Sequence, residues 1–474
     1  MGHVIEKLES VQRRLDALAR THRVAGASLA ILDGSELLEF TTGVTSVNTG
    51  VDVTPETLFQ IGSNTKLYTT TLLMQLVDEG RVKLDKPVRT YVRGFKVADS
   101  DAAASITVKQ LLNHTSGIQG DYFADHGRGD DCVANYVESM AELTQVTAPG
   151  KMFSYCNSGF TLAGRLIEEV RGAPYHEVLK ERLLAPLGLR STTVLAEEML
   201  AFRYAVGHLP GPDGRPVPAP MVLMPRSSAP AGSLTSATAR DVLGFVQMHL
   251  DHGKGSDGKR ILSEKAVLAM QSPTVAIPGR SIGSNVGLGW MVADWDGEPM
   301  IGHGGGTIGQ LSFLHVLPRR RFAVCLLTNT AAGGLLFRDL GRWIFQELAG
   351  VSIPAVAKPA DPKPSLDLKK YEGRYERLGV AVDVVAGEGE LRVTSTATGP
   401  LARLGDSSET VPAQPVDAET FYTAVGGIER LVAFLDFQAG RPRFVHMAGR
   451  AAARSGPAKK AAVKKAPRPA RGRK

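Results

Sequence analysis

Hydrophobic and polar positions along the first 350 residues follow two periods, one of strands and one of helices. Residues 24–32 and 36–42 read as strands, and Asp33-Gly34-Ser35 between them predicts a hairpin. Apolar residues recur every three to four positions in several later segments, which predicts helices over 66–79, 108–113, 159–171, 175–184, 236–250 and 335–349. Further strands are predicted over 287–292, 312–317 and 321–328. One antiparallel sheet assembled from both ends of this region would accommodate that order.

The pattern changes after residue 350. Residues 351–366 are proline-rich and predict a stiff linker, and residues 367–450 carry short alternating runs that predict a small all-β domain, a sandwich or a barrel. Residues 451–474 form a basic tail that we expect to be disordered. The predicted domain at the other end, residues 1–350, opens with an amphipathic helix over residues 1–20.

Charge is concentrated in the tail. The formal net charge is +7, but eight of the basic residues lie in 455–474, and the remainder holds 47 basic and 48 acidic residues. We therefore expect no nucleic-acid interface across the fold, although the tail alone could contact nucleic acid or an anionic surface. No apolar run approaches the ~20 residues of a membrane helix, and no secretory signal is evident, so we expect a cytoplasmic protein. The oligomeric state is not defined by the sequence.

Ser63 and Lys66 are the first candidate catalytic residues. Residues three apart on a helix share one face, so the lysine amine would lie beside the serine hydroxyl. A serine becomes a good nucleophile when a neighbouring base takes its proton, and a lysine can be that base if burial lowers its pKa. Ser-x-x-Lys is a motif of penicillin-interacting enzymes, although a single copy is weak evidence.

Two further motifs follow Ser63 along the chain. Tyr155 and Asn157 lie in Ser154-Tyr155-Cys156-Asn157, where an extended backbone would point both the same way, with the Cys156 thiol opposite them as a small buried filler. A phenol can relay a proton, and a side-chain amide can hold a substrate carbonyl. The third motif, Gly302-His303-Gly304-Gly305-Gly306, offers an open strand edge where a ligand can lie.

These motifs, in this order, resemble the serine β-lactamase and penicillin-binding-protein superfamily, and most closely its class C branch with D-peptidases and esterases. Supporting segments include Leu111–Gly117, Pro230–Leu234 and Leu327–Asn329. The resemblance implies an α/β (α+β) fold with an antiparallel sheet flanked by helices and an inserted all-helical subdomain. Tyr371-Glu372-Gly373-Arg374-Tyr375 resembles the start of the lipocalin-like domain that some of these hydrolases carry.

The resemblance also implies the roles of individual residues. Ser63 would be the nucleophile, Lys66 its activating partner, and Tyr155 the proton shuttle to the leaving group. Asn157 would position substrate together with Gly305 and Gly306, and backbone N–H groups of Ser63 and Gly306 would form the oxyanion hole. His303 stands where many relatives have a lysine. Because a neutral histidine provides no fixed cation for a substrate carboxylate, this departure argues against an efficient β-lactamase.

Other chemistry is not expected. Gly304–Gly309 matches a dinucleotide-binding pattern, but a strand-like run follows it instead of a helix. His249 and His252 flank Asp251 at a helix end, which we interpret as a solvated terminus and not as a metal site. His114 is interpreted as a packed loop histidine. Cys132, Cys156 and Cys325 have no metal-binding spacing, so neither a metal nor another cofactor is expected.

Three functions remain open. The first is a serine hydrolase that forms a Ser63 acyl-enzyme with a small-molecule or peptide substrate, which is an ester or amide and includes D-amino-acid peptides as a candidate class. The second is a penicillin-binding-protein-type thioesterase that cyclises nonribosomal peptides. The third is a sensor of β-lactams or peptidoglycan fragments that is acylated without turnover.

Overall fold

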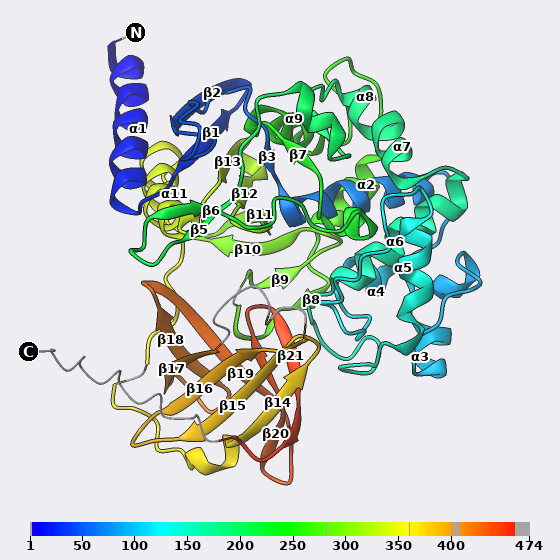
Figure 1. Cartoon of the computed structure of the whole chain (residues 1–474), viewed down its shortest axis with the longest axis vertical. Coiled ribbons are helices and arrows are strands. Elements are labelled where there is room, and N and C mark those ends of the chain that lie inside the picture. The colour runs from blue at the N-terminus through cyan, green and yellow to red at the C-terminus, as the bar shows by residue number, and fades with distance from the viewer. Residues whose placement is uncertain (1, 281, 360, 400–401, 403–407, 460–474) are drawn as a thin grey trace, which may run out of the picture. The chain divides into compact units, whose positions relative to one another are not determined.

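The computed structural model describes residues 2–280, 282–359, 361–399, 402 and 408–459. The chain divides into two compact units (Figure 1): unit 1 comprises Met1–Val356 with Ala448–Arg450, and unit 2 comprises Ala357–Met447 with Ala451–Lys474. Ala448–Arg450 thus belongs to unit 1, although it lies between two segments of unit 2 in the sequence. None of the described helices is long and apolar enough to cross a membrane.

Unit 1 contains an eight-stranded antiparallel sheet with the order β2-β1-β13-β12-β11-β10-β9-β8. The strands are β1 (Gly26–Asp33), β2 (Glu36–Gly43), β8 (Val275–Ala276), β9 (Asn285–Val286), β10 (Met291–Trp295), β11 (Glu298–Gly306), β12 (Leu311–Leu317) and β13 (Phe322–Thr328). The N-terminal hairpin β1–β2 therefore joins the C-terminal strands through β13, as the sequence pattern predicted. The predicted strand over 287–292 is wrong at its start, because residues 287–290 lie between β9 and β10.

Helices cover both faces of this sheet. α1 (Gly2–Thr21) and α11 (Gly333–Ala349) pack on one face, where Val11 and Leu15 of α1 share a buried cluster with Leu29 and Ile31 of β1. α9 (Ala239–Leu250) packs against β1 and β13. Both sides of β1 are therefore buried, which is why this strand is almost continuously apolar.

The inserted region between β2 and β8 is largely helical. It contains α2 (Thr65–Asp78), α3 (Ser100–Ser105), α4 (Val108–Leu112), α5 (Cys132–Ser139), α6 (Asn157–Arg171), α7 (Tyr175–Leu179), α8 (Ala185–Leu187), α9 and α10 (Glu264–Gln271). Short strands β3 (Phe59–Gln60), β4 (Thr192–Thr193) and β7 (Ser236–Ala237) form a small sheet, and β5 (His208–Pro210) pairs with β6 (Pro216–Pro218). The helix predicted over 236–250 begins instead at Ala239, because β7 occupies its first residues and Thr238 caps the helix.

Unit 2 is a closed eight-stranded barrel. Its strands are β14 (Gly373–Arg377), β15 (Val380–Ala386), β16 (Leu391–Ala397), β17 (Ser408–Pro415), β18 (Thr420–Val425), β19 (Ile428–Gln438), β20 (Arg441–Met447) and β21 (Arg450–Gly456). Tyr371, Tyr375 and Phe434 belong to its apolar core. The fold is thus the expected helix-flanked antiparallel sheet followed by a small all-β domain that fits a lipocalin-like barrel.

One expectation for the end of the chain is wrong. The basic tail was predicted to be disordered from residue 451, but residues 451–456 belong to β21, which pairs with β14. The low-complexity composition of the tail hides this strand, because its buried residues Ala451 and Ala452 are small. The remainder of the predicted tail from residue 460 onward lies outside the described residues.

Candidate active site

Ser63 lies in a short 3₁₀ turn, Gly62–Asn64, that leads directly into α2. Lys66 follows within the first turn of the helix, and its Nζ lies 2.9 Å from Ser63 Oγ and donates to it. A second hydrogen bond of 2.6 Å joins Lys66 Nζ to the carbonyl oxygen of Ala231. The structure therefore brings the predicted nucleophile and its predicted activating partner into direct contact.

Lys66 is completely buried, which is rare for a lysine. Burial is the largest cause of a pKa that lies well below the usual lysine value, and the positive charge of Arg450 lowers this pKa further. Asp121 and Cys156 oppose that shift. A lysine whose ammonium form is destabilised in this way can hold a free amine, which is the form that accepts a proton from serine.

Glycines allow β11 to approach Ser63 closely. Gly62 has a positive φ of 51°, and a Cβ there would lie 2.6 Å from the backbone nitrogen of Gly306. A Cβ on Gly305 would lie 2.0 Å from the carbonyl oxygen of Ile61. The backbone of Gly306 therefore sits against the residue that precedes Ser63. An oxyanion hole formed by the backbone N–H groups of Ser63 and Gly306 requires that these residues lie close together. That role of the two N–H groups stays a prediction.

Tyr155 is buried among aromatic and cationic side chains. Its ring stacks on His114 with centroids 4.2 Å apart, and Lys66 Nζ and Arg450 Cζ each lie 4.9 Å from the ring centroid. Burial raises the pKa of the phenol well above its usual value, and a hydrogen-bonding interaction with Ser63 opposes the rise. Tyr155 is therefore a neutral phenol at pH 7, suited to donate a proton and not to act as a phenolate base.

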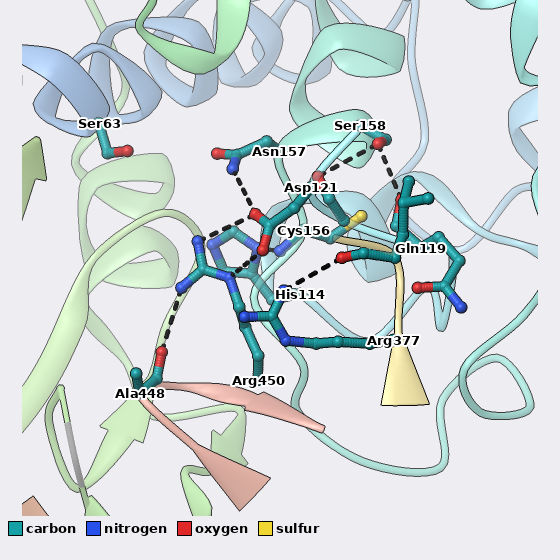
Figure 2. A network of polar contacts seen from close by, with 12 residues as sticks. Ser63, His114, Gln119, Asp121, Cys156, Asn157, Ser158, Arg377, Ala448 and Arg450 are labelled. Atoms are coloured by element: carbon teal, nitrogen blue, oxygen red, sulfur yellow. Dashed lines mark hydrogen bonds and ion pairs between the residues drawn. The ribbon is translucent and has the colours of Figure 1, made fainter. Parts of the chain in front are cut away.

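Asn157 is the first residue of α6, and its side chain is held by Asp121 (Figure 2). Asn157 Nδ2 donates to Asp121 Oδ1 over 3.1 Å, and Arg450 Nε lies 2.8 Å from Asp121 Oδ2. Asp121 is itself buried. One of the two N–H groups of the amide therefore faces a carboxylate, and the expectation that the Asn157 amide holds a substrate carbonyl stays a prediction.

His303 lies in β11 and lines the same cavity as Ser63. Its Nδ1 lies 2.6 Å from the carbonyl oxygen of Gly304, so Nδ1 carries the proton and donates. Burial, with a contribution from Lys66, lowers the pKa of His303 to about 3. The imidazole is therefore neutral at pH 7, as we expected for a histidine at the position where many relatives have a lysine.

The cavity in front of Ser63 has a volume of about 370 Å³. Polar groups of Ser63, Tyr155, Asn157 and His303 line it together with the backbone of Gly304–Gly306. The remaining wall is mainly apolar and includes Phe123, Met224, Ile282, Met291, Leu311 and Phe313. The guanidinium of Arg450 is the cationic group among the described lining residues. Such a cavity suits an acyl group with an apolar side chain.

Cys156 and His114 pack next to Tyr155 and Asn157. Cys156 is buried, and its Sγ accepts a hydrogen bond of 3.2 Å from the N–H of Gly159, so it caps α6. Burial raises the pKa of this thiol to about 11, which keeps it protonated and unreactive. His114 Nδ1 accepts the N–H of Cys156 over 3.0 Å. Both are packed residues, as the sequence analysis proposed.

The residues that sequence reasoning missed are Asp121 and Arg450. Their pairing joins positions 329 residues apart, so no local motif could indicate it. Of the two histidines near Asp251, His252 is exposed as expected, whereas His249 is buried between Phe245 and Trp290 and is not solvated. Within the described residues, no group of three or more His, Cys, Asp or Glu side chains could hold a metal ion.

Comparisons with known proteins agree with this geometry. The Beta-lactamase family model matches residues 11–349. Penicillin-binding protein 4 of Amycolatopsis lactamdurans is 42% identical over 374 residues, covering 78% of this chain and 98% of that protein.

Solved structures of related proteins are also similar to this chain. The crystal structure of SurE has a TM-score of 0.77 and 27% identity, covering 95% of this chain and 99% of that one, and a SurE structure with D-Leu has a TM-score of 0.74 and 26% identity. D-amino acid amidase from Ochrobactrum anthropi SV3 complexed with D-phenylalanine has a TM-score of 0.56 and 27% identity, covering 68% and 92%. The chain belongs to the Beta-lactamase family, within the serine hydrolase superfamily.

Proposed function

We propose that this protein is a serine acyl-enzyme hydrolase whose acyl substrates are esters or amides of D-amino acids or their peptides. The contact between Lys66 Nζ and Ser63 Oγ at 2.9 Å carries the proposal, because the lysine is buried and its pKa is lowered. A free amine next to a hydroxyl at the mouth of a cavity is the arrangement that nucleophilic catalysis by serine requires.

The steps of the reaction follow from the protonation states. Lys66 as a free amine takes the proton of Ser63 Oγ while that oxygen attacks the substrate carbonyl carbon. The developing negative charge on the carbonyl oxygen is held by backbone N–H groups of Ser63 and Gly306. Tyr155, a neutral phenol, gives its proton to the leaving group and takes back from the Lys66 ammonium the proton that Lys66 removed from Ser63. Water then repeats the sequence on the acyl-enzyme.

The D configuration is supported by the similar structures. SurE was crystallised with D-Leu, and the Ochrobactrum enzyme is a D-amino acid amidase. The apolar wall formed by Phe123, Met224, Leu311 and Phe313 would accept the side chain of such a residue. We therefore expect substrates with apolar D residues, such as leucine or phenylalanine, on the acyl side of the scissile bond.

The test is p-nitrophenol release from short-chain p-nitrophenyl esters and from N-acetyl-D- and L-phenylalanine p-nitrophenyl esters, with wild type and Ser63→Ala at equal concentration. The proposal predicts release that Ser63→Ala abolishes and a preference for the D ester. Release that persists in the variant would refute a Ser63 acyl-enzyme. A single burst without turnover would instead identify a sensor.

A second candidate is transfer of the acyl group to an amine of the same peptide, which gives a cyclic product. It is favoured by the two-unit layout, since penicillin-binding-protein-type thioesterases resemble this chain in carrying a lipocalin-like domain after the hydrolase domain. The discriminating measurement is the product of a linear peptide thioester, analysed by mass spectrometry. A product lighter by one water than the linear acid supports cyclisation, whereas the linear acid alone supports hydrolysis.

A further inference from the structure

The orientation of the Asn157 side chain is chemically fixed (Figure 2). A carboxylate accepts hydrogen bonds and cannot donate them, so the 3.1 Å contact with Asp121 Oδ1 requires that the amide nitrogen of Asn157 face Asp121. Asp121 cannot relax from this role easily, because it is buried and paired with the guanidinium of Arg450. The contact uses one of the two N–H groups of Asn157, so the carbonyl oxygen Oδ1 and the second N–H remain for a substrate.

Asn157 Oδ1 receives no hydrogen bond from any described residue, and Asn157 lines the cavity next to Ser63. In Figure 2 the oxygen of the amide points away from Asp121, on the side where Ser63 is drawn. The active-site cavity therefore offers the side-chain oxygen of Asn157 as a hydrogen-bond acceptor.

His303 offers a second acceptor to the same cavity. Its Nδ1 proton is used by the carbonyl oxygen of Gly304, which leaves the lone pair of Nε2. Nε2 is buried and has no hydrogen-bond partner among the described residues, while His303 lines the cavity. A buried acceptor without a partner is costly, and a ligand that supplies an N–H group removes that cost.

We propose that Asp121 is a positioning residue that turns the Asn157 amide so that its oxygen receives an N–H on the α-nitrogen of the acyl residue. The substrate class is then an aminoacyl or N-acylaminoacyl group that carries this N–H, and not its N-methyl or deamino analogue. The inference rests on the proposed function, because it concerns the acyl group that Ser63 accepts. It assigns substrate selection to a residue outside all three sequence motifs.

The experiment compares two esters that differ in one hydrogen-bond donor: N-acetyl-D-phenylalanine p-nitrophenyl ester and its N-methyl analogue. We expect the wild-type kcat/KM to favour the N–H ester by about tenfold, the discrimination that one hydrogen bond supplies. In Asp121→Leu this ratio should fall towards one, mainly through loss on the N–H ester.

Asp121→Asn is a second variant of the same shape. Its amide can donate as well as accept, so Asn157 can turn either way, and the ratio should fall between those of wild type and Asp121→Leu. Asp241→Asn is the control, because Asp241 is a buried carboxylate that accepts hydrogen bonds from Ser191 and Thr192 and does not line the cavity. This control should keep the wild-type ratio.

The outcomes separate the two hypotheses. A Ser63-dependent release with a wild-type ratio near one overturns the N–H inference and leaves the proposed hydrolase intact. A wild-type preference that is unchanged in Asp121→Asn, or in a folded Asp121→Leu, overturns the role of Asp121. If neither ester gives Ser63-dependent release, the proposed function and this inference are both overturned.

Discussion

Arg450 Nε lies 2.8 Å from Oδ2 of Asp121, and both charges of this ion pair act on Lys66. The Arg450 charge lowers the pKa of Lys66, whereas Asp121 raises it. Arg450→Gln removes the cation and leaves the carboxylate without its ionic partner, and both changes raise the pKa of Lys66. Because Lys66 must be a free amine to act as a base, the acid limb of the kcat/KM profile should move to higher pH. A profile measured from pH 5 to 9 with a p-nitrophenyl ester checks this, and an unmoved limb would contradict it.

Replacement of Lys66 should remove the base and leave substrate binding largely intact. Lys66→Met fills similar space without an amine, and general base catalysis typically contributes 10²–10⁴-fold, so kcat should fall by about that factor. Lys66→Arg should not restore activity, because a guanidinium stays protonated at every accessible pH. Stopped-flow acylation rates give the answer, with thermal unfolding to verify that each variant folds. Substantial activity in Lys66→Arg would argue that the side chain acts only as a cation.

Gly62 offers a steric test of the nucleophile turn. Gly62→Ala places a Cβ 2.6 Å from the Gly306 nitrogen, whereas Gly80→Ala, also at positive φ, meets no atom within 4 Å. Both substitutions should cost about 1–2 kcal/mol of stability from the left-handed backbone alone. Only Gly62→Ala should also lower kcat, by about tenfold or more, since it displaces an expected oxyanion donor. Equal kcat values for the two folded variants would remove Gly306 from that role.

Because His303 is neutral, we expect the protein to have weak activity on β-lactams. Its pKa of about 3 leaves the cavity without the fixed cation that binds a substrate carboxylate at this position. Nitrocefin hydrolysis should therefore be slow relative to ester hydrolysis, and His303→Lys should raise kcat/KM for nitrocefin relative to an uncharged ester. The ratio of the two substrates is the measurement, so a general loss of folded enzyme does not affect it. A lowered ratio would indicate that the carboxylate binds elsewhere.

Because His249 is buried, we expect the folded protein to lose stability in acid. Burial lowers its pKa to about 3 in the folded protein, against about 6.5 in the unfolded chain. As pH falls below 6.5, the unfolded chain gains a proton that folded His249 does not, so stability declines until about pH 3. At pH 5 the loss from this residue is about 2 kcal/mol relative to pH 7.5. Urea unfolding of wild type and His249→Phe at the two pH values should show a smaller decline in the variant, and equal declines would exclude His249 as the cause.

The sequence predicted the hairpins and helices whose residues are close together along the chain. The β1–β2 hairpin follows from two alternating runs around Asp33-Gly34-Ser35, and α2 follows from its helical period and the Gly80 stop. β21 was missed because its strand residues are alanines and arginines with little β propensity, held in place by pairing with β14.

In the candidate site, too, contacts between neighbours in the sequence were predictable and contacts between distant residues were not. The short spacings of Ser63 with Lys66 and of Tyr155 with Asn157 were visible in the sequence, and the structure places Lys66, Tyr155 and Asn157 around Ser63. The direction in which Asn157 presents its amide was not visible. It depends on Asp121, and the charge that steadies Asp121 comes from Arg450, far along the chain. Long-range electrostatic partners leave no period or spacing for a sequence pattern to reveal.

The assignment of Ala448–Arg450 to unit 1 sets an order of events during synthesis. A ribosome makes Ser63, Lys66 and the whole β1–β13 sheet long before it reaches Arg450, which follows seven of the eight barrel strands. The nascent chain therefore carries its nucleophile before it carries the cation that completes the ion pair with Asp121. Formation of the Asp121–Arg450 ion pair is consequently a late event in synthesis, and a chain that stops short of residue 450 lacks this partner of Asp121.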